Sequence, residues 1–195
     1  LKNLAGDGYD KAEADETRTG ETDTDYTIVE ADVKAFAGFT YDKANAENVL
    51  TGTINGNGTL VLKLYYSRDS YKVTYSYTST PAGATELPAE AMYKYGATVT
   101  IAAGATAPGY TFNGWNPAED FTMPSENVDI KGSFTAKDDT AFKIEYYLEN
   151  LAGDGYDKAD ADAARTGTTD TEYTIVEGDV KAFPGFTYDP ENANN

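Results

Sequence analysis

The chain contains no cysteine and no histidine among its 195 residues. Without cysteine it has no disulfide, no thiolate nucleophile and no thiolate metal ligand. Without histidine it lacks the commonest general base and metal ligand, which excludes the usual nucleophile–base triads. Carboxylate pairs remain for glycosidase-type chemistry, but most acidic residues stand in polar loop segments. We therefore expect no enzymatic activity, and the sequence assigns no catalytic, cofactor-binding or metal-ligating residue and no cofactor.

Basic residues are also scarce. The chain has 15 lysine and arginine residues against 33 aspartate and glutamate residues, which gives a formal net charge of −18. A field of that sign repels phosphate backbones and anionic lipid headgroups, so we expect no nucleic-acid partner. No apolar run approaches the roughly 20 residues needed to span a bilayer, so this segment is not expected to insert into a membrane.

Aromatic residues, by contrast, are abundant and regularly spaced. The chain has 16 tyrosines and 18 glycines, and 40% of its residues are hydrophobic. This composition favours strands and turns over helices and disfavours a disordered chain. Short helical turns are expected at Leu87–Tyr93 and Ala31–Phe36. The sequence thus predicts a β-rich α+β protein with helix in fewer than about a fifth of its residues.

A long segment of the chain occurs twice. Leu1–Asn48 and Leu148–Asn195 align without a gap at an offset of 147, and 37 of the 48 aligned positions are identical. A long internal repeat is the signature of a modular array. The chain starts and stops inside the repeated unit, so we expect it to be a window of a longer array.

A fainter similarity divides each 147-residue unit into two modules. The alternating segment Tyr71–Thr80 resembles Phe142–Asn150, and the closing segment Thr59–Tyr66 resembles Asn127–Phe134. Strict alternation is the period of a half-buried strand. We predict three modules, each about 70 residues long when complete, near the lower limit for independent folding. They are residues 1–69, without a first strand, residues 70–137, and residues 138–195, without the C-terminal part.

The same alternation predicts the core. One face of each expected strand must be buried, and the residues on those faces are Ile144, Tyr146, Val73, Tyr75, Leu60, Leu62, Leu64, Val128, Ile130, Phe112 and Trp115. Trp115 could instead stack on a sugar ring, but a lone tryptophan in such a segment more often anchors a small core. Lys63 and Lys131 fall at outward positions, which disfavours an intramolecular isopeptide bond because that bond needs a buried lysine.

Several motifs resemble a known family. YKVTYSY, YGATVTI, PGYTFNGW and FTMPSENVDIKGSFTA, all within residues 70–137, resemble the Listeria–Bacteroides repeat, or internalin-type B repeat, of bacterial surface proteins. KIEYYLEN, GFTYD and VLTGTI, in the other two modules, are similar to relatives of that group and to mucin-binding-protein-type repeats. The resemblance implies β-grasp-like modules, a Gram-positive-type or gut bacterium, and an extracellular, cell-surface or cell-wall-attached location. It brings no catalytic residues.

Two further features invite a binding interpretation. Asp154–Asp162 and its twin Asp7–Asp15 are rich in carboxylates, and oxygen ligands suit Ca²⁺. The residue order of an EF-hand loop is absent, however, and a lysine stands inside each run, so alternation favours an exposed strand face. Tyr65 and Tyr147 lie outside the alternating core face and could form a contact stripe, although cross-strand packing is the more ordinary arrangement.

The expected function is structural. The joints Ser67–Ser70 and Ala136–Thr140 are short and are not Gly/Ser linkers, so we expect tandem modules in an extended rod with contacts only between neighbours. Such a rod would be a stalk segment of a bacterial surface adhesin or fibre. The alternative is that the modules themselves bind host glycan or protein, which an exposed aromatic patch recurring every 147 residues would support. Incomplete modules could also be completed by another copy of the chain through strand addition.

Overall fold

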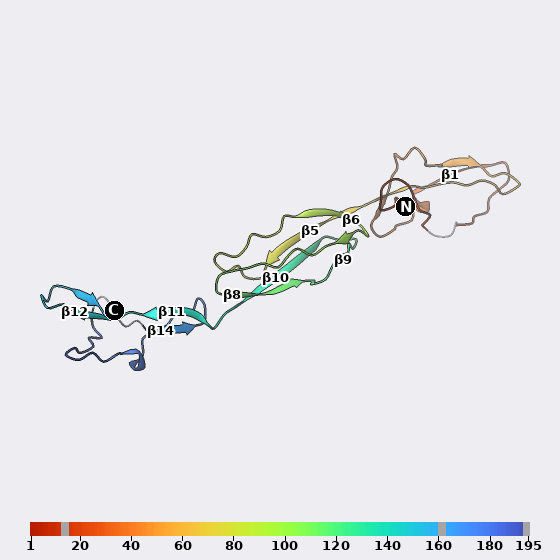
Figure 1. The fold of residues 1–195 in the computed structure, drawn as a ribbon. Helices are drawn as coiled ribbons and strands as arrows, with labels where there is room; N and C mark the ends of the chain where they lie inside the picture. Colours follow the sequence, from red (N-terminus) through yellow and green to blue (C-terminus); the bar gives the residue numbers. More distant parts are fainter. Residues whose placement is uncertain (13–15, 160–162, 193–195) are drawn as a thin grey trace. The chain divides into compact units, whose positions relative to one another are not determined.

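The computed structural model describes residues 1–12, 16–159 and 163–192. These residues form short β-strands joined by long loops, and no α-helix occurs among them (Figure 1). The helical turns described are two single 3-10 turns, η1 (Glu30–Asp32) and η2 (Glu177–Asp179). The prediction of a β-rich chain with little helix is confirmed, and no helix of the described part is both long and apolar enough to cross a membrane.

The largest sheet lies in the middle third of the chain. It has four strands in the order β6 (Ala91–Lys94), β5 (Ser70–Tyr77), β10 (Val128–Ala136) and β8 (Tyr110–Asn116). β5 and β10 run parallel, whereas β5 and β6 form an antiparallel pair. Both β5 and β10 carry the period-2 alternation that the sequence analysis used to predict strands.

The remaining strands form two-stranded ladders, all of them antiparallel. In the N-terminal part of the chain β1 (Asp25–Thr27) pairs with β3 (Thr51–Thr53), and β2 (Phe39–Tyr41) pairs with β4 (Tyr66–Arg68). In the C-terminal part β11 (Thr140–Ile144) pairs with β14 (Ala163–Gly167), and β12 (Tyr147–Glu149) pairs with β13 (Tyr156–Lys158). Between them, β7 (Thr98–Val99) pairs with β9 (Phe121–Thr122).

The contacts group the chain into two compact units. The first copy of the repeat falls in one unit and the second copy in the other. The first unit comprises residues 1–78, 86–104 and 114–132, and the second comprises residues 79–85, 105–113 and 133–195. The predicted module boundaries after residues 69 and 137 stay a prediction, as do the β-grasp topology and the rod.

The core of the first unit is small and dense. Val99, Met123 and Ile130 are fully buried, and Val73 nearly so. Trp115 is 6% exposed and donates its indole N–H to the carbonyl of Ala103 at 3.0 Å. Burial of these side chains supplies most of the stabilisation available to so small a body.

The predicted core is confirmed in part. Val73, Ile130 and Trp115 are buried, while the other eight predicted residues are half-buried rather than fully enclosed. The predicted alternation holds along Leu60–Leu64, where Val61 and Lys63 point outward between half-buried leucines. Lys131 is likewise exposed. Fully buried Val99 and Met123 were not predicted, because each lies in a two- to four-residue segment too short to show a period.

Three secondary-structure predictions need correction. Leu87–Tyr93 is not helical, because residues 91–94 pair with β5 along the sheet edge, and tertiary pairing overrides a weak helical propensity. Thr59–Tyr66 is not a continuous strand, since Lys63 makes only an isolated bridge to Val49. The segment Phe142–Asn150 is broken after Ile144 into β11 and β12. The short turn expected at Ala31–Phe36 is represented only by η1.

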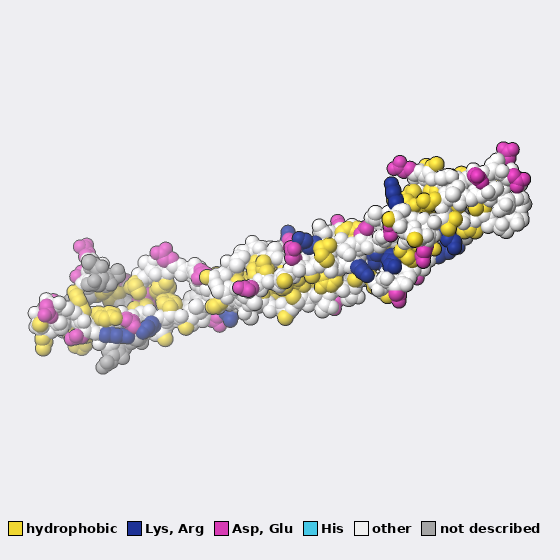
Figure 2. Space-filling view, turned by 90° about the horizontal axis from the view of Figure 1, so that it is seen from above, with side chains coloured by type: hydrophobic (Ala, Val, Ile, Leu, Met, Phe, Trp, Pro, Cys, Tyr) yellow, Lys and Arg dark blue, Asp and Glu magenta, His cyan; other side chains and the backbone are white. Residues whose placement is uncertain are grey.

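The surface carries the charge excess that the composition predicts. Acidic side chains are distributed along the face shown in Figure 2, with fewer basic ones among them. Hydrophobic atoms also reach this surface in many small groups, as expected where most aromatic side chains are only half-buried (Figure 2).

Candidate functional site

The second copy of the repeat contains a buried carboxylate. Asp179, the last residue of η2, is only 5% exposed. Its Oδ1 accepts hydrogen bonds from Nη2 and Nε of Arg165, at 3.1 and 3.3 Å. Its Oδ2 accepts from the hydroxyl of Tyr173 at 2.8 Å and from the amide of Val176 at 3.0 Å. Both oxygens are therefore satisfied, which is the condition under which a charge can be buried at low cost.

The first copy builds the same cluster. Asp32 lies at the end of η1, and its side chain accepts from the Tyr26 hydroxyl at 3.0 Å and from the Val29 amide at 2.8 Å. Arg18 forms an ion pair with the same carboxylate. The four residues correspond one to one, at the offset of 147, with those around Asp179.

The local sequence explains why both clusters form. Each aspartate is the third residue of its turn and reaches back to the amide of the residue that precedes the turn. That reciprocal arrangement satisfies amides which a helical turn leaves without partners. Val29 and Val176 have nearly the same extended backbone, with φ of −109° and −112°. The repeated sequence therefore forms the same local structure in both copies.

Hydrogen bonding lowers the pKa values of both aspartates. Donation from the Val176 amide, then from Tyr173, lowers the pKa of Asp179 below its ordinary value of 3.8. Donation from the Val29 amide, then from Tyr26 and Arg18, lowers the pKa of Asp32 in the same way. Each carboxylate is therefore bound in its charged form.

This direction predicts an acid-labile contribution to stability. A carboxylate whose pKa is lower in the folded state stabilises the fold above its unfolded pKa, near 3.8, and loses that contribution as the pH falls through its folded pKa. The chain should have a higher melting temperature than the double variant Asp32→Asn/Asp179→Asn at pH 7. The difference should shrink below about pH 4, where both aspartates begin to protonate.

Differential scanning calorimetry of both proteins at pH 7, 5, 4 and 3 measures this prediction. The comparison with the double variant matters because the other carboxylates also titrate, and their protonation relieves the repulsion within an acidic chain. A melting-temperature difference that stays constant over the whole pH series would show that the two aspartates are not held as charged groups.

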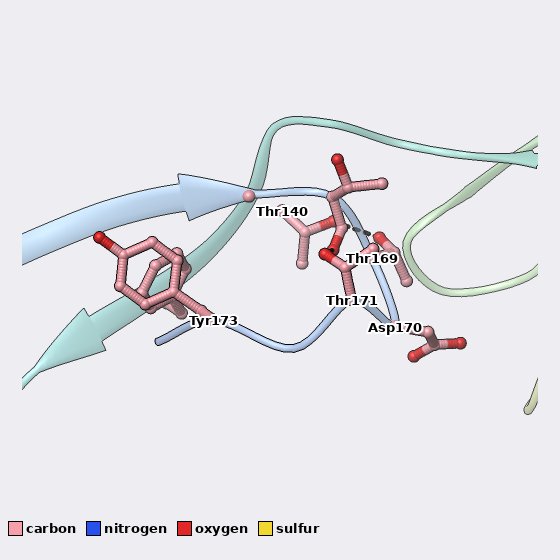
Figure 3. Close-up of a pocket in the computed structure, with 8 residues that line it drawn as sticks. Thr140, Thr169, Asp170, Thr171 and Tyr173 are labelled. Atoms are coloured by element: carbon pink, nitrogen blue, oxygen red, sulfur yellow. Dashed lines mark hydrogen bonds between the residues drawn. The ribbon is translucent and has the colours of Figure 1, made fainter. Parts of the chain in front are cut away.

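A depression lies beside the carboxylate of the second copy. It has a volume of about 350 Å³ and is lined by Thr140, Phe142, Gly167, Thr168, Thr169, Asp170, Thr171 and Tyr173. Figure 3 shows the ring of Tyr173 at one end and the threonines at the other. Thr140 and Thr169 share a hydroxyl–hydroxyl hydrogen bond of 2.5 Å, and the Asp170 carboxylate accepts from Tyr110 at 2.7 Å.

The depression offers a shape and hydrogen-bonding groups rather than reactive chemistry. Its lining includes four threonine hydroxyls and that of Tyr173, and its carboxylate, Asp170, accepts a hydrogen bond from Tyr110. Over residues 1–12, 16–159 and 163–192, no three acidic side chains come together in a way that could hold a metal ion.

Trp115 has the role that the sequence analysis favoured. Its ring stacks on Tyr77, with centroids 5.5 Å apart, and meets Tyr75 edge-on at 4.9 Å. The Tyr75 hydroxyl accepts from the amide of Ala102, on the loop that also receives the indole N–H of Trp115. Trp115 is therefore a core residue and presents no face for a sugar ring.

The two acidic runs form turns in their described parts. Asp7 and Asp154 each accept a hydrogen bond from the side-chain amide of the asparagine four residues earlier, Asn3 and Asn150, at 2.8 and 2.9 Å. Both asparagines also cap backbone amides of the same turn. Residues 13–15 and 160–162, which complete the runs, lie outside the described residues, and calcium binding stays an open alternative.

The two tyrosines singled out for a contact stripe have different environments. Tyr65 is half-buried and packs edge-on against Tyr9, with ring centroids 4.7 Å apart. Tyr147 is exposed, and its hydroxyl donates to Glu145 at 2.8 Å. Glu145 also pairs with Lys143 and Lys158, and these partners together with Tyr147 lower its pKa to about 2. The structure does not unite Tyr65 and Tyr147 in one stripe within either unit.

Sequence reasoning missed the carboxylate clusters. The signal available was that Arg18, Tyr26 and Asp32 all recur unchanged at residues 165, 173 and 179, together with an aspartate at the third position of a turn. Acidic residues in polar segments, Asp32 and Asp179 among them, were instead interpreted as solvent-exposed surface, which is the usual case.

The comparisons with known proteins are sparse. No family model and no curated protein matches the chain. A solved structure described as "Streptococcal High Identity Repeats in Tandem (SHIRT) domains 3-4 from cell surface protein" is similar over 63% of this chain and 82% of that one, with 21% identity and a TM-score of 0.26.

Proposed function

We propose that this chain is a structural repeat segment of a bacterial cell-surface adhesin or fibre, which projects or assembles rather than catalyses. The observation that carries the proposal is the recurrence of structure. The 3-10 turn that ends at Asp32 recurs as the turn that ends at Asp179. In both copies the aspartate side chain accepts hydrogen bonds from the amide of the valine before the turn and from a tyrosine hydroxyl. Repetition of both sequence and local structure is typical of a repeat protein, which becomes longer by the addition of units.

The chemistry of the described residues supports the same proposal. The chain has no histidine and no cysteine, and the carboxylate that lines the depression beside Tyr173, Asp170, accepts a hydrogen bond from Tyr110. The net charge of −18 suits a long surface protein that must stay soluble at high local concentration. The resemblance of residues 70–137 to internalin-type B repeats supports an extracellular location and neighbouring modules as the first partners.

The alternative of host glycan or protein binding finds less support in the aromatic residues. Tyr26, Phe39 and Tyr41 are half-buried in the first copy, whereas their counterparts Tyr173, Phe186 and Tyr188 are exposed in the second. An aromatic patch that served a host ligand in every module would be exposed at both places. The difference between the copies instead concerns which strands cover them.

The proposal is tested by the solution shape of the chain, because a projecting segment has to be longer than a compact body of the same mass. Small-angle X-ray scattering of the monomeric chain distinguishes the two directly, since modules joined end to end and modules folded against one another differ widely in radius of gyration.

A further inference from the structure

Three asparagines of the chain are each followed by a glycine: Asn55, Asn57 and Asn113. An asparagine in this position can react with its own backbone. Glycine has no Cβ, so nothing on the next residue hinders its amide nitrogen from approaching the side-chain carbonyl carbon of the asparagine. The three sites share this intrinsic reactivity, and their surroundings in the folded chain decide which of them reacts.

Asn55 begins the turn at the tip of a hairpin. The arms of this hairpin are joined where Val49 and Lys63 exchange two backbone hydrogen bonds of 3.0 Å. The turn is closed by the Gly58 amide, which donates to the Asn55 carbonyl at 2.9 Å. All residues from 55 to 59 are exposed. The tip of the hairpin is therefore open to water.

The two groups that would react at Asn55 are unrestrained. Within the residues that the structure describes, neither the side-chain amide of Asn55 nor the backbone N–H of Gly56 makes a hydrogen bond to another protein group. Both groups belong to adjacent residues, so they meet through rotation about single bonds of Asn55 alone. The approach breaks no hydrogen bond within the protein.

Asn57 lies in the same turn but is restrained twice. Its attacking group would be the Gly58 amide, and that N–H is donated to the Asn55 carbonyl. A hydrogen bond to the neutral N–H opposes the loss of its proton, which the attack requires. The side-chain Oδ1 of Asn57 also accepts from the hydroxyl of Thr59 at 2.8 Å and from its amide at 3.2 Å. These bonds hold the side chain on Thr59.

Asn113 is restrained by the sheet. It lies in β8, which pairs with β10. Its Nδ2 donates to the Ser133 hydroxyl at 3.0 Å, and its Oδ1 accepts from the Thr135 hydroxyl at 3.1 Å. Both hydrogen bonds have to break before this side chain can turn toward the amide of Gly114. Of the three asparagines, Asn55 alone is poised to react.

We propose that Asn55 is a self-modification site, at which the chain converts asparagine into aspartate and isoaspartate without an enzyme. The deprotonated nitrogen of Gly56 attacks the Cγ atom of Asn55. The N–Cγ bond forms and the Cγ–Nδ2 bond breaks. Ammonia leaves with the proton that the nitrogen lost, and a cyclic succinimide remains. Water then opens the ring at one of its two carbonyl carbons, so the co-reactant is water and nothing is oxidised or reduced.

The two ring openings have different structural results. Opening at Cγ restores the normal main chain as aspartate, whereas opening at the backbone carbonyl routes the main chain through Cβ and Cγ as isoaspartate. Either product places a new carboxylate at the hairpin tip. Isoaspartate also adds a methylene carbon to the main chain inside the turn that the Gly58 amide closes. We therefore expect the Gly58 amide to exchange faster with solvent in the isoaspartate form.

The test incubates the purified chain at pH 8 and 37 °C and follows each asparagine by peptide mapping with mass spectrometry. Isoaspartate is quantified by enzymatic methylation with a labelled methyl donor. Conversion at Asn55 should be at least tenfold faster than at Asn57 or Asn113. It should accelerate with rising pH, because the attacking nitrogen has to be deprotonated. In concentrated urea, which removes the turn and the sheet, the three rates should approach one another.

Gly56→Ala is the variant that locates the reaction. A Cβ at Gly56 meets the Cγ2 atom of Thr22 at 3.5 Å, an ordinary contact, so the variant is expected to fold. Its methyl group hinders the attacking nitrogen, and conversion at Asn55 should fall at least tenfold. Gly178→Ala, where a Cβ meets nothing within 4 Å, is the control and should leave the rate at Asn55 unchanged.

Three outcomes would overturn the proposal: equal rates at Asn55 and Asn57 in the folded chain, an Asn55 rate that Gly56→Ala leaves unchanged, or conversion at Asn55 only after unfolding in urea. The proposed structural function depends on none of these outcomes, because it is tested separately by the solution shape of the chain.

Discussion

Replacing Met123 with alanine should lower the free energy of unfolding of the first unit by about 2–5 kcal/mol. Met123 is fully buried, and its backbone joins two loops by accepting from Gly96 and donating to Ala97. Alanine keeps those backbone bonds but leaves a cavity in place of the fully buried methionine side chain. A small body has a total stability of about 5–15 kcal/mol, so this is a large fraction of it.

The chain supplies its own control, because it has only two methionines. Met92 lies on β6 and is 61% exposed. Met92→Ala removes the same atoms from a solvated position and should change stability by no more than about 0.5 kcal/mol. Urea unfolding followed by the fluorescence of Trp115, the sole tryptophan and a core residue of the same unit, measures both variants. Equal midpoints for the two variants would contradict the burial assigned to Met123.

Gly38→Ala should be similarly damaging, for two separable reasons. Gly38 is buried with φ of +76°, a conformation that costs an alanine about 1–2 kcal/mol. A Cβ at this position would also lie 2.1 Å from the Cγ atom of Tyr95, so the ring must move, and overpacking of this kind costs about 1–3 kcal/mol. The sum predicts a loss of about 2–5 kcal/mol in the first unit.

Gly58→Ala separates the two contributions. Gly58 also has a positive φ, of 68°, but a Cβ there meets nothing within 4 Å. It should therefore lose only the backbone contribution, about 1–2 kcal/mol. Calorimetric melting of both variants and the parent chain gives the comparison. If Gly38→Ala and Gly58→Ala lower the melting temperature equally, that result would contradict the close contact between Gly38 and the ring of Tyr95.

The alternation of apolar and polar residues in the sequence was enough to predict which way the side chains of a strand point. The alternation around Val73, Ile130 and Leu60–Leu64 placed apolar side chains inward and Lys63 and Lys131 outward, as the structure has them. Direction follows from the pleat of a strand, which any local segment shows. Depth of burial does not follow, because it depends on what covers the face. Leu62 lies on the predicted face and yet is only half-buried.

The remaining features depend on partners distant in the sequence. Residues 91–94 are a strand because β5, some twenty residues earlier, offers a sheet edge. Asp179 is buried because Arg165 and Tyr173 reach it with the right geometry, although it stands in acidic, polar text.

We propose that the modules extend the chain rather than fold against one another, and small-angle X-ray scattering tests this proposal most directly. Three modules of about 30 Å placed end to end give a rod of about 90 Å with a radius of gyration of about 27 Å. A single compact body of 195 residues would have a radius of gyration of about 16 Å. Measured on the monomeric chain at physiological salt, a value near 27 Å with a linear cross-section plot is the predicted result. A value near 16 Å would contradict the account.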